Sequence, residues 1–123
     1  AIKLLVKLLR DEVPGVREEA AAALGNLAFY NTETNYGNQV AIVEAGAIAP
    51  LVKLLRDFVP RVQGVAAGAL RNLAARNAEN QATIVQSGAV AHLVRLLKKG
   101  NLPVVVLVEA MGALRNLAAR NSQ

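Results

Sequence analysis

The sequence predicts an all-α chain made of stacked helical repeats. Ten residues, Gly68 to Asn77, return letter for letter as Gly112 to Asn121, and a looser version runs from Ala22 to Asn31. One asparagine keeps its place in every version, at spacings of 46 and 44 residues: Asn26, Asn72 and Asn116. A period of this length is typical of arrays in which each helical unit packs on its neighbours.

The composition fits such an array and limits the possible functions. Hydrophobic residues make up 54% of the chain and aromatic residues only 3%, so we expect a core of Leu, Val, Ile and Ala. The net charge of +5 favours acidic partners weakly, but the basic residues are too dispersed to predict a nucleic-acid partner. Without cysteines, a signal peptide or a membrane-spanning run, we expect an intracellular protein of the cytoplasm or nucleus, with no membrane partner.

The first unit contains a medium, a long and a short helix. Apolar residues form a broad face over Ala1–Arg10, which predicts the medium helix. The long helix is expected over Pro14–Tyr30, because a proline in the first helical turn loses no hydrogen bond. A polar connector, Asn31–Gly37, then leads to a short helix near Asn38–Glu44.

The same pattern returns twice. After the glycines Gly46 and Gly88, the medium helix is expected again as Ala47–Arg56 and Ala89–Lys98. Prolines then introduce the second and third long helices: Pro60 and Pro103. Between Arg95 and Asn116 the third unit carries two extra residues and a run of β-branched valines, so its long helix is expected to begin late or irregularly.

Aromatic residues gather around the first connector, which is four residues longer than its counterpart in the second unit: Phe29, Tyr30 and Tyr36. Aromatic anchors on an inserted loop can form a binding hot spot. We expect Phe29 to cover the end of the core, and the role of Tyr36 stays open.

Three motifs resemble the armadillo repeat, the three-helix unit of importin-alpha, the catenins and many plant and protist proteins. They are Gly-Ala-Ile-Ala-Pro-Leu-Val-Lys-Leu-Leu (Gly46–Leu55), Ala-Leu-Arg-Asn-Leu-Ala (Ala69–Ala74) and Glu-Asn-Gln-Ala-Thr-Ile-Val-Gln-Ser-Gly (Glu79–Gly88). The motifs recur in the right order, and the resemblance covers the whole chain. It implies a right-handed α-solenoid in which each repeat has short, medium and long helices.

The resemblance implies one continuous solenoid domain of about three repeats. Residues 1–45 are a first repeat without its first helix, followed by the first helix of the next unit; 46–87 are a complete unit of 42 residues; and 88–123 are a last repeat without the following short helix. Repeat arrays ordinarily end in polar capping units, and neither end here looks like one, so we expect self-association through exposed repeat ends. Net charges of −2, +3 and +4 along the three parts favour a head-to-tail order.

The recurring asparagine is the main candidate for binding. Leucines two residues before and one residue after it face the core, so the asparagine points away from the core. In armadillo arrays the long helices line a concave groove, and the resemblance implies that the asparagines hydrogen-bond the backbone of an extended peptide: Asn26, Asn72 and Asn116. A side-chain amide offers both a donor and an acceptor for this purpose. The alternative is that these amides only brace neighbouring helices.

Other side chains on the same face are expected to set specificity. They stand one or seven residues before an asparagine, or four after it: Glu19, Glu109, Arg71, Arg115, Tyr30, Arg76 and Arg120. Arg71 and Arg115 are expected to clamp a carboxylate of the partner, unless they are ordinary solvated arginines. Nuclear-import members of the family carry a tryptophan four residues before the asparagine, whereas this chain has none, so we do not expect their mode of binding to localisation peptides.

Basic residues recur near the end of each medium helix: Lys7 and Arg10, Lys53 and Arg56, Arg95 and Lys98. Such charges complement the negative end of the helix dipole and keep the convex surface soluble. A site for a polyanion or a membrane surface is the alternative.

We therefore expect a protein-interaction scaffold that binds an extended peptide in the groove of the long helices. The alternatives are a structural or assembly segment with an empty groove, and a consensus-like engineered scaffold. Catalysis has no support in the sequence, because the single histidine, His92, and the two serines, Ser87 and Ser122, belong to no catalytic motif. No phosphate-binding glycine loop and no metal-ligand spacing occur, so no cofactor and no metal are expected.

Overall fold

Helices form every regular element that the structure describes. The computed structural model of the protein describes residues 1–29 and 33–119. Within those residues the helices are α1 (Ile2–Leu8), α2 (Pro14–Ala28), α3 (Glu33–Glu44), α4 (Ile48–Leu54), α5 (Pro60–Ala74), α6 (Ala78–Gln86), α7 (Ala89–Lys99) and α8 (Val104–Ala118). The predicted all-α fold is confirmed. Among the described helices, none combines the length and the apolar character needed to cross a bilayer.

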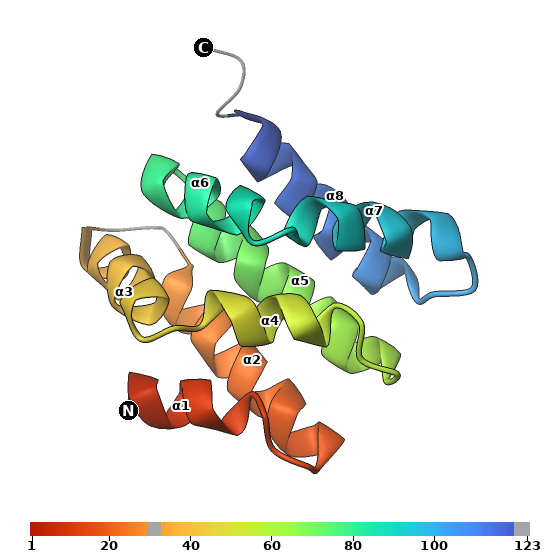
Figure 1. Ribbon diagram of the computed structural model, residues 1–123, viewed down its shortest axis with the longest axis horizontal. Helices are drawn as coiled ribbons and strands as arrows, with labels where there is room; N and C mark the ends of the chain where they lie inside the picture. Colours follow the sequence, from red (N-terminus) through yellow and green to blue (C-terminus); the bar gives the residue numbers. More distant parts are fainter. Residues whose placement is uncertain (30–32, 120–123) are drawn as a thin grey trace.

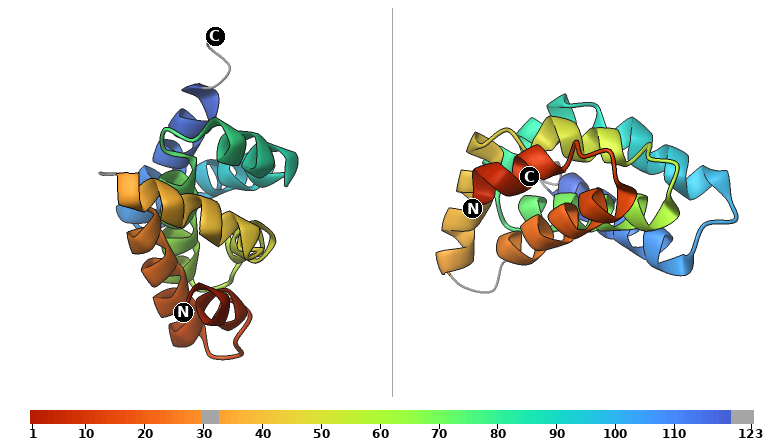
Figure 2. Two further views of the ribbon diagram at one scale, coloured as in Figure 1. Left: turned by 90° about the vertical axis from the view of Figure 1, so that its left-hand side faces the viewer. Right: turned by 90° about the horizontal axis from the view of Figure 1, so that it is seen from below.

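The three kinds of helix occupy different parts of the molecule. The long helices α2, α5 and α8 lie side by side in one layer, and α5 packs against both of the others (Figure 1). The medium helices α1, α4 and α7 form a second layer on one side of them, and the short helices α3 and α6 lie toward one end (Figure 2). The molecule therefore has a long-helix face and a medium-helix face.

Prolines and glycines set the helix boundaries where the sequence predicts them. Pro14 and Pro60 occupy the first turn of α2 and α5, each after an extended valine. Gly46 and Gly88 have φ values of 89° and 88° just before α4 and α7. Glycine adopts this left-handed conformation without the steric cost that a side chain adds. Each short helix therefore ends before the glycine, and the medium helix begins after it.

The first short helix begins earlier than the sequence predicts. It starts at Glu33 rather than near Asn38, so part of the expected polar connector is helical. Gln39 and Ile42 are completely buried, and this packing outweighs the weak helix propensity of a segment that contains Gly37. The longer connector thus gives α3 12 residues where α6 has 9.

The third long helix is regular, contrary to the prediction. Helix α8 has 15 residues, as α2 and α5 do, and its asparagine stands at the same position. Val106 is fully buried, so the packing of this valine offsets its lower helix propensity. The extra length lies in α7, which has 11 residues where α4 has 7. The chain then turns at Gly100 and Asn101, which have φ values of 71° and 60°.

Close contacts at glycines bring the long helices together. A Cβ atom added to Gly25 of α2 would lie 3.3 Å from the Cα atom of Ala69 in α5. A Cβ atom added to Gly64 of α5 would lie 3.2 Å from a methyl carbon of Val106 in α8. The described core consists of Leu, Ile, Val and Ala, as the composition predicts. Small residues at these contacts explain how a core without large aromatic side chains is filled.

An ion pair joins the first two units on the medium-helix face. Arg17 of α2 binds one carboxylate oxygen, Oδ1 of Asp57, through Nε at 3.0 Å and through a terminal nitrogen at 2.9 Å. Its other terminal nitrogen donates to the carbonyl oxygens of Asp11 and Glu12. The Arg17 and Asp57 side chains are only 12% and 8% exposed, so this pair is largely shielded from water.

Candidate functional site: the long-helix face

The asparagines of the second and third long helices tie each helix to the one before it. Asn72 Nδ2 donates to the carbonyl oxygen of Gly25 at 2.9 Å. Asn116 Nδ2 donates to the carbonyl oxygen of Arg71, also at 2.9 Å. In both cases the acceptor immediately precedes the asparagine of the previous long helix. The bracing contacts that the sequence left as an alternative are therefore present, and they occupy the amide nitrogens.

An ion pair lies across α5 and α8 on the same face. Arg71 donates to Glu109 Oε1 at 2.6 Å. A Cβ atom on Gly68 would lie 2.8 Å from Glu109 Oε2, and one on Gly112 would lie 2.7 Å from Arg71 Cδ. The ion pair thus fills the space above two glycines. The expectation that Arg71 lies free on the flank to clamp a partner is wrong, because the neighbouring repeat already supplies the carboxylate.

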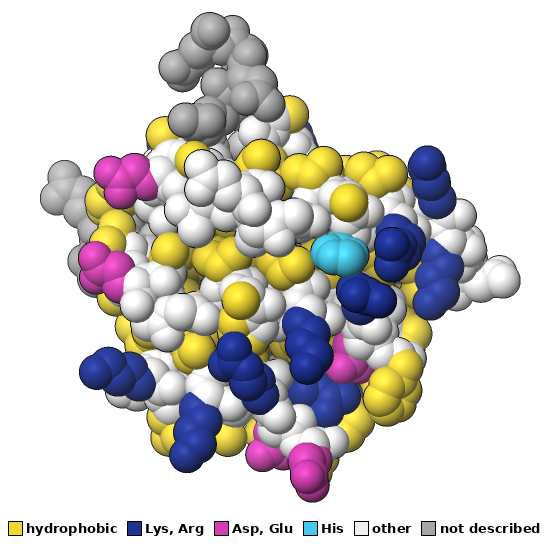
Figure 3. Space-filling view, in the orientation of Figure 1, with side chains coloured by type: hydrophobic (Ala, Val, Ile, Leu, Met, Phe, Trp, Pro, Cys, Tyr) yellow, Lys and Arg dark blue, Asp and Glu magenta, His cyan; other side chains and the backbone are white. Residues whose placement is uncertain are grey.

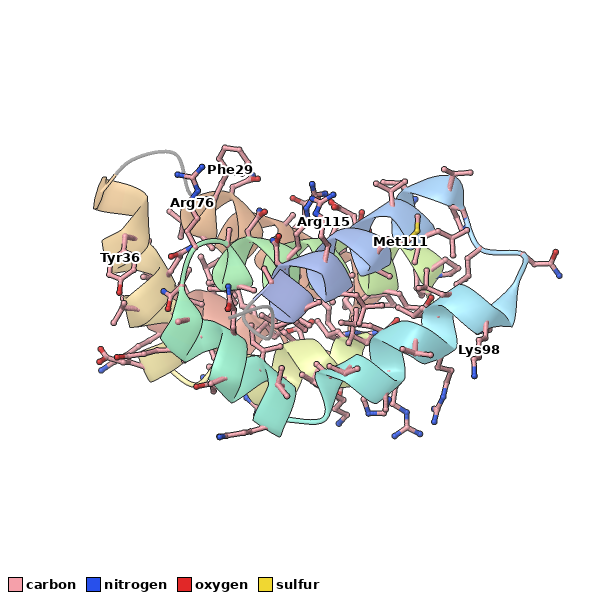
Figure 4. The ribbon with its side chains drawn as sticks, turned by 90° about the horizontal axis from the view of Figure 1, so that it is seen from above. Phe29, Tyr36, Arg76, Lys98, Met111 and Arg115 are labelled. Carbon is pink, nitrogen blue, oxygen red and sulfur yellow. The ribbon has the colours of Figure 1, made fainter. Side chains whose placement is uncertain are left out.

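A shallow pocket of about 400 Å³ opens beside these contacts. Its lining comes from α5 and α8 and from the residues that follow the ends of α2 and α5: Phe29, Arg71, Asn72, Ala75, Glu109, Arg115 and Asn116. Phe29, Arg76 and Arg115 project from the same side of the molecule (Figure 4). The prediction that Phe29 covers the core is wrong, since this side chain is 55% exposed. It directly follows the end of α2, and it lines the pocket.

The structure brings together five of the residues that the sequence singled out, and three others lie elsewhere among the described residues. Glu19 and Asn26 are exposed on α2 and do not line this pocket. Arg76 is exposed just after α5, with a φ of 54°. Tyr30 and Arg120 lie outside the described residues. The pocket gathers the rest: Arg71, Asn72, Glu109, Arg115 and Asn116.

The sequence match and the fold agree on the family. Armadillo/beta-catenin-like repeats match residues 1–29, 35–75 and 77–119. The chain belongs to the armadillo repeat family. Its asparagine-bearing long helices are therefore the third helices of armadillo repeats, and the predicted right-handed α-solenoid is confirmed.

Engineered proteins are among the solved structures similar to this armadillo chain. The designed armadillo repeat protein YIII(Dq)4CqI is 39% identical, with a TM-score of 0.86 over 97% of this chain and 48% of that one. An engineered protein is 41% identical, with a TM-score of 0.86 over 96% of this chain and 27% of that one. The designed armadillo repeat protein YIII(Dq.V1)4CPAF, in complex with the peptide (KR)4, is 35% identical, with a TM-score of 0.82 over 95% of this chain and 46% of that one. This chain spans less than half of each. A comparison with curated proteins found no match.

Buried amides close the C-terminal end of the middle long helix, a feature that the sequence analysis missed. Gln39 of α3 is fully buried and donates from Nε2 to the carbonyl oxygens of Asn72 and Ala75, at 2.8 and 3.0 Å. Its own Oε1 accepts a hydrogen bond from Asn77 Nδ2 at 3.2 Å. The short helix of the second armadillo repeat thus satisfies carbonyl groups of the long helix of that same repeat.

The short helix α6 supplies donors for the two carbonyl groups that lie between those of Asn72 and Ala75 in the sequence. Asn80 Nδ2 donates to the Leu73 carbonyl at 2.9 Å, and Gln81 Nε2 donates to the Ala74 carbonyl at 2.8 Å. The last carbonyl groups of a helix have no partner within the helix, so a buried helix end needs such donors. The spacing of these amides relative to the buried Ile84, on one face of α6, is the signal that would have identified them.

Proposed function

We propose that this armadillo chain is a protein-interaction scaffold that binds an extended peptide along its long-helix face. The observation that carries the proposal is the pocket of about 400 Å³ in which Asn72 and Asn116 meet the exposed Phe29. A similar designed armadillo repeat protein in complex with the peptide (KR)4 supports the proposal that this chain binds a peptide.

The contacts on this face define how the peptide is held. Because Asn72 and Asn116 donate from Nδ2 to neighbouring helices, each has its Oδ1 left to accept an N–H group of the peptide backbone. Phe29 offers an apolar surface to one peptide side chain. Arg71 and Glu109 neutralise one another, so Arg115 is the remaining charge of the pocket lining. We therefore propose a ligand that combines an apolar residue with a carboxylate.

Phe29→Ser is expected to weaken the binding of such peptides at least about tenfold, which corresponds to about 1.4 kcal/mol. The ligands would be selected from a random peptide display library on the parent chain and measured by fluorescence anisotropy. The chain supplies a matched control, because its other phenylalanine, Phe58, is 82% exposed and lines a pocket on the medium-helix face. Phe58→Ser should leave the affinity unchanged. Equal affinities for both variants would place the binding site elsewhere.

Assembly through the ends of the array is a second candidate function, and the joint between α5 and α8 favours it. In that joint Arg71 binds Glu109, and Asn116 donates to the Arg71 carbonyl. Glu19 and Asn26 of α2 occupy the helix positions of Glu109 and Asn116, and Arg115 of α8 occupies that of Arg71. These three side chains are exposed on the outer faces of α2 and α8. We propose that α2 of a second copy docks on α8, with Glu19 on Arg115. Val104, Val108 and Met111, 73%, 45% and 51% exposed on α8, would be covered there.

Charge reversal tests this joint by sedimentation velocity. Arg115→Glu alone and Glu19→Lys alone are each expected to abolish association, because like charges would then meet across the joint. The double variant restores an opposite pair and should associate again. Identical sedimentation of the parent, single and double variants would exclude this head-to-tail contact.

A further inference from the structure

Two equivalent pockets lie on the medium-helix face, one at each joint between successive units. The first has a volume of about 650 Å³ and lies between the ends of α1 and α4. The second has a volume of about 500 Å³ and lies between the ends of α4 and α7. Residues at matching helix positions line both pockets, so the differences between them reveal what is particular to each.

The first pocket nearly balances its charges. Its cations are Arg10, Arg17, Lys53 and Arg56, and its carboxylates are Asp11, Glu12 and Asp57. The ion pair between Arg17 and Asp57, 2.9 Å apart, fills its centre. This pocket has little positive charge left for a ligand.

The second pocket has cations but no carboxylate among its lining residues. Gln63 stands at the helix position of Arg17, His92 at that of Pro50, and Lys99 at that of Asp57. The polar residues that line it are Arg56, Gln63, His92, Arg95, Lys98 and Lys99. In Figure 3 the cyan imidazole of the single histidine has dark-blue Lys and Arg side chains beside and below it. The acid that neutralises the first joint is therefore replaced by a further cation.

Two residues that line this pocket, Gln63 and His92, each have a buried polar atom without a partner. Gln63 is only 4% exposed; its Nε2 donates to the Asp57 carbonyl at 2.5 Å. Its Oε1 and the Nδ1 atom of His92 are the buried side-chain atoms of the described chain that lack a hydrogen-bond partner. Buried polar atoms normally find partners, so such a pair in one pocket indicates a missing donor and a missing acceptor.

We propose that this pocket binds a small anion that carries more than one phosphate group. Arginine matches phosphate oxygens with its planar fork of donors, and lysine adds point charges. A protonated phosphate or a neighbouring hydroxyl donates to Gln63 Oε1, and a phosphate oxygen accepts from His92. A volume of about 500 Å³ is in the range of sites for small ligands. A soluble polyphosphate and a phosphorylated lipid headgroup share this chemistry.

The electrostatics of His92 provide a direct probe. Its burial lowers the pKa of the imidazole, and the positive charges of Arg56 and Arg95 lower the pKa further. Arg56 lies in the turn after α4, whereas Arg95, Lys98 and Lys99 belong to α7, and α5 contributes the neutral Gln63. A bound phosphate offsets these positive charges, so the pKa of His92 should rise on binding.

Proton NMR of the only imidazole in the chain, titrated with inorganic pyrophosphate at fixed ionic strength, tests the proposal. We expect saturable 1:1 binding and an upward shift of the His92 pKa. Arg95→Gln with Lys98→Gln should weaken binding at least tenfold. Lys3→Gln with Lys7→Gln removes the same charge from α1, away from this pocket, and should change affinity less than twofold. Equal losses in the two variants, or no saturation, would overturn the proposal.

A second experiment, with lipid vesicles, distinguishes a soluble polyphosphate from a phosphorylated lipid headgroup. Vesicles that contain phosphatidylserine alone are compared with vesicles that also contain a phosphoinositide, by cosedimentation with the chain. Pyrophosphate binding without phosphoinositide-dependent cosedimentation assigns the site to a soluble anion. Binding in both assays, lost together in the variant with Arg95→Gln and Lys98→Gln, assigns it to a lipid headgroup.

Discussion

Replacing Arg17 by methionine is expected to lower the free energy of unfolding by about 3 kcal/mol. The Asp57 carboxylate is only 8% exposed, and Arg17 is the cation that binds it, at 2.9 Å. Without Arg17 that carboxylate stays buried and uncompensated, which costs about 3 to 5 kcal/mol for fully buried pairs. The lower end applies because Asp57 Oδ2 still accepts a hydrogen bond from the Val59 amide. Urea unfolding followed by circular dichroism measures the change.

A surface ion pair of the same chain provides the control. Arg61 and Glu18 are 3.3 Å apart, and the Arg61 side chain is 76% exposed. Arg61→Met should lower the free energy of unfolding by less than about 0.5 kcal/mol, since exposed pairs contribute little. Adding Asp57→Asn to Arg17→Met removes the buried charge and should recover part of the lost stability. If Arg17→Met costs no more than Arg61→Met, the buried pair has no special role at this joint.

Gln39→Leu is expected to cost a similar amount, about 3 kcal/mol. The change keeps the size and burial of the side chain but removes the donor to the carbonyl oxygens of Asn72 and Ala75 and the acceptor for Asn77. Each buried polar group left without a partner costs about 1 to 3 kcal/mol. The Asn72 carbonyl still accepts from the Ala75 amide, which limits the total.

Gln86→Leu is the matched control for Gln39→Leu, because Gln86 is exposed at the end of α6. Its effect should stay within about 0.5 kcal/mol. Amide hydrogen exchange adds a local readout: protection should fall most in the last turn of α5 for Gln39→Leu. A stability loss spread evenly over α1 to α8 would mean that Gln39 acts through packing rather than through these hydrogen bonds.

The features that could be predicted from the sequence are those set by nearby residues. Pro14, Pro60, Gly46 and Gly88 mark helix boundaries through their own backbone preferences, and the 3.6-residue period identifies the core face. The recurring asparagine gives the register of the long helices. Each of these preferences acts within one helix. Because the sequence repeats, the same prediction applies to every unit of the array.

The contacts between helices were harder to predict. Arg71 and Glu109 lie 38 residues apart, and each was placed on the ligand-facing side because helical periodicity shows the face but not the neighbour. The same limit hid Gln39, which resembles an ordinary surface glutamine until α5 is known to end beside it. Phe29 was misjudged because a large apolar side chain usually covers a core, whereas Leu, Ile, Val and Ala already fill this one.

The third unit shows where an armadillo array can change its length. Its extra residues lengthen α7, which the turn at Gly100 and Asn101 follows, yet Asn116 keeps the hydrogen bond that its counterpart Asn72 makes. Both turn residues are exposed. This loop is therefore the natural place to insert a tag, a fluorophore or a second binding segment, because added residues there leave the spacing of the long helices undisturbed.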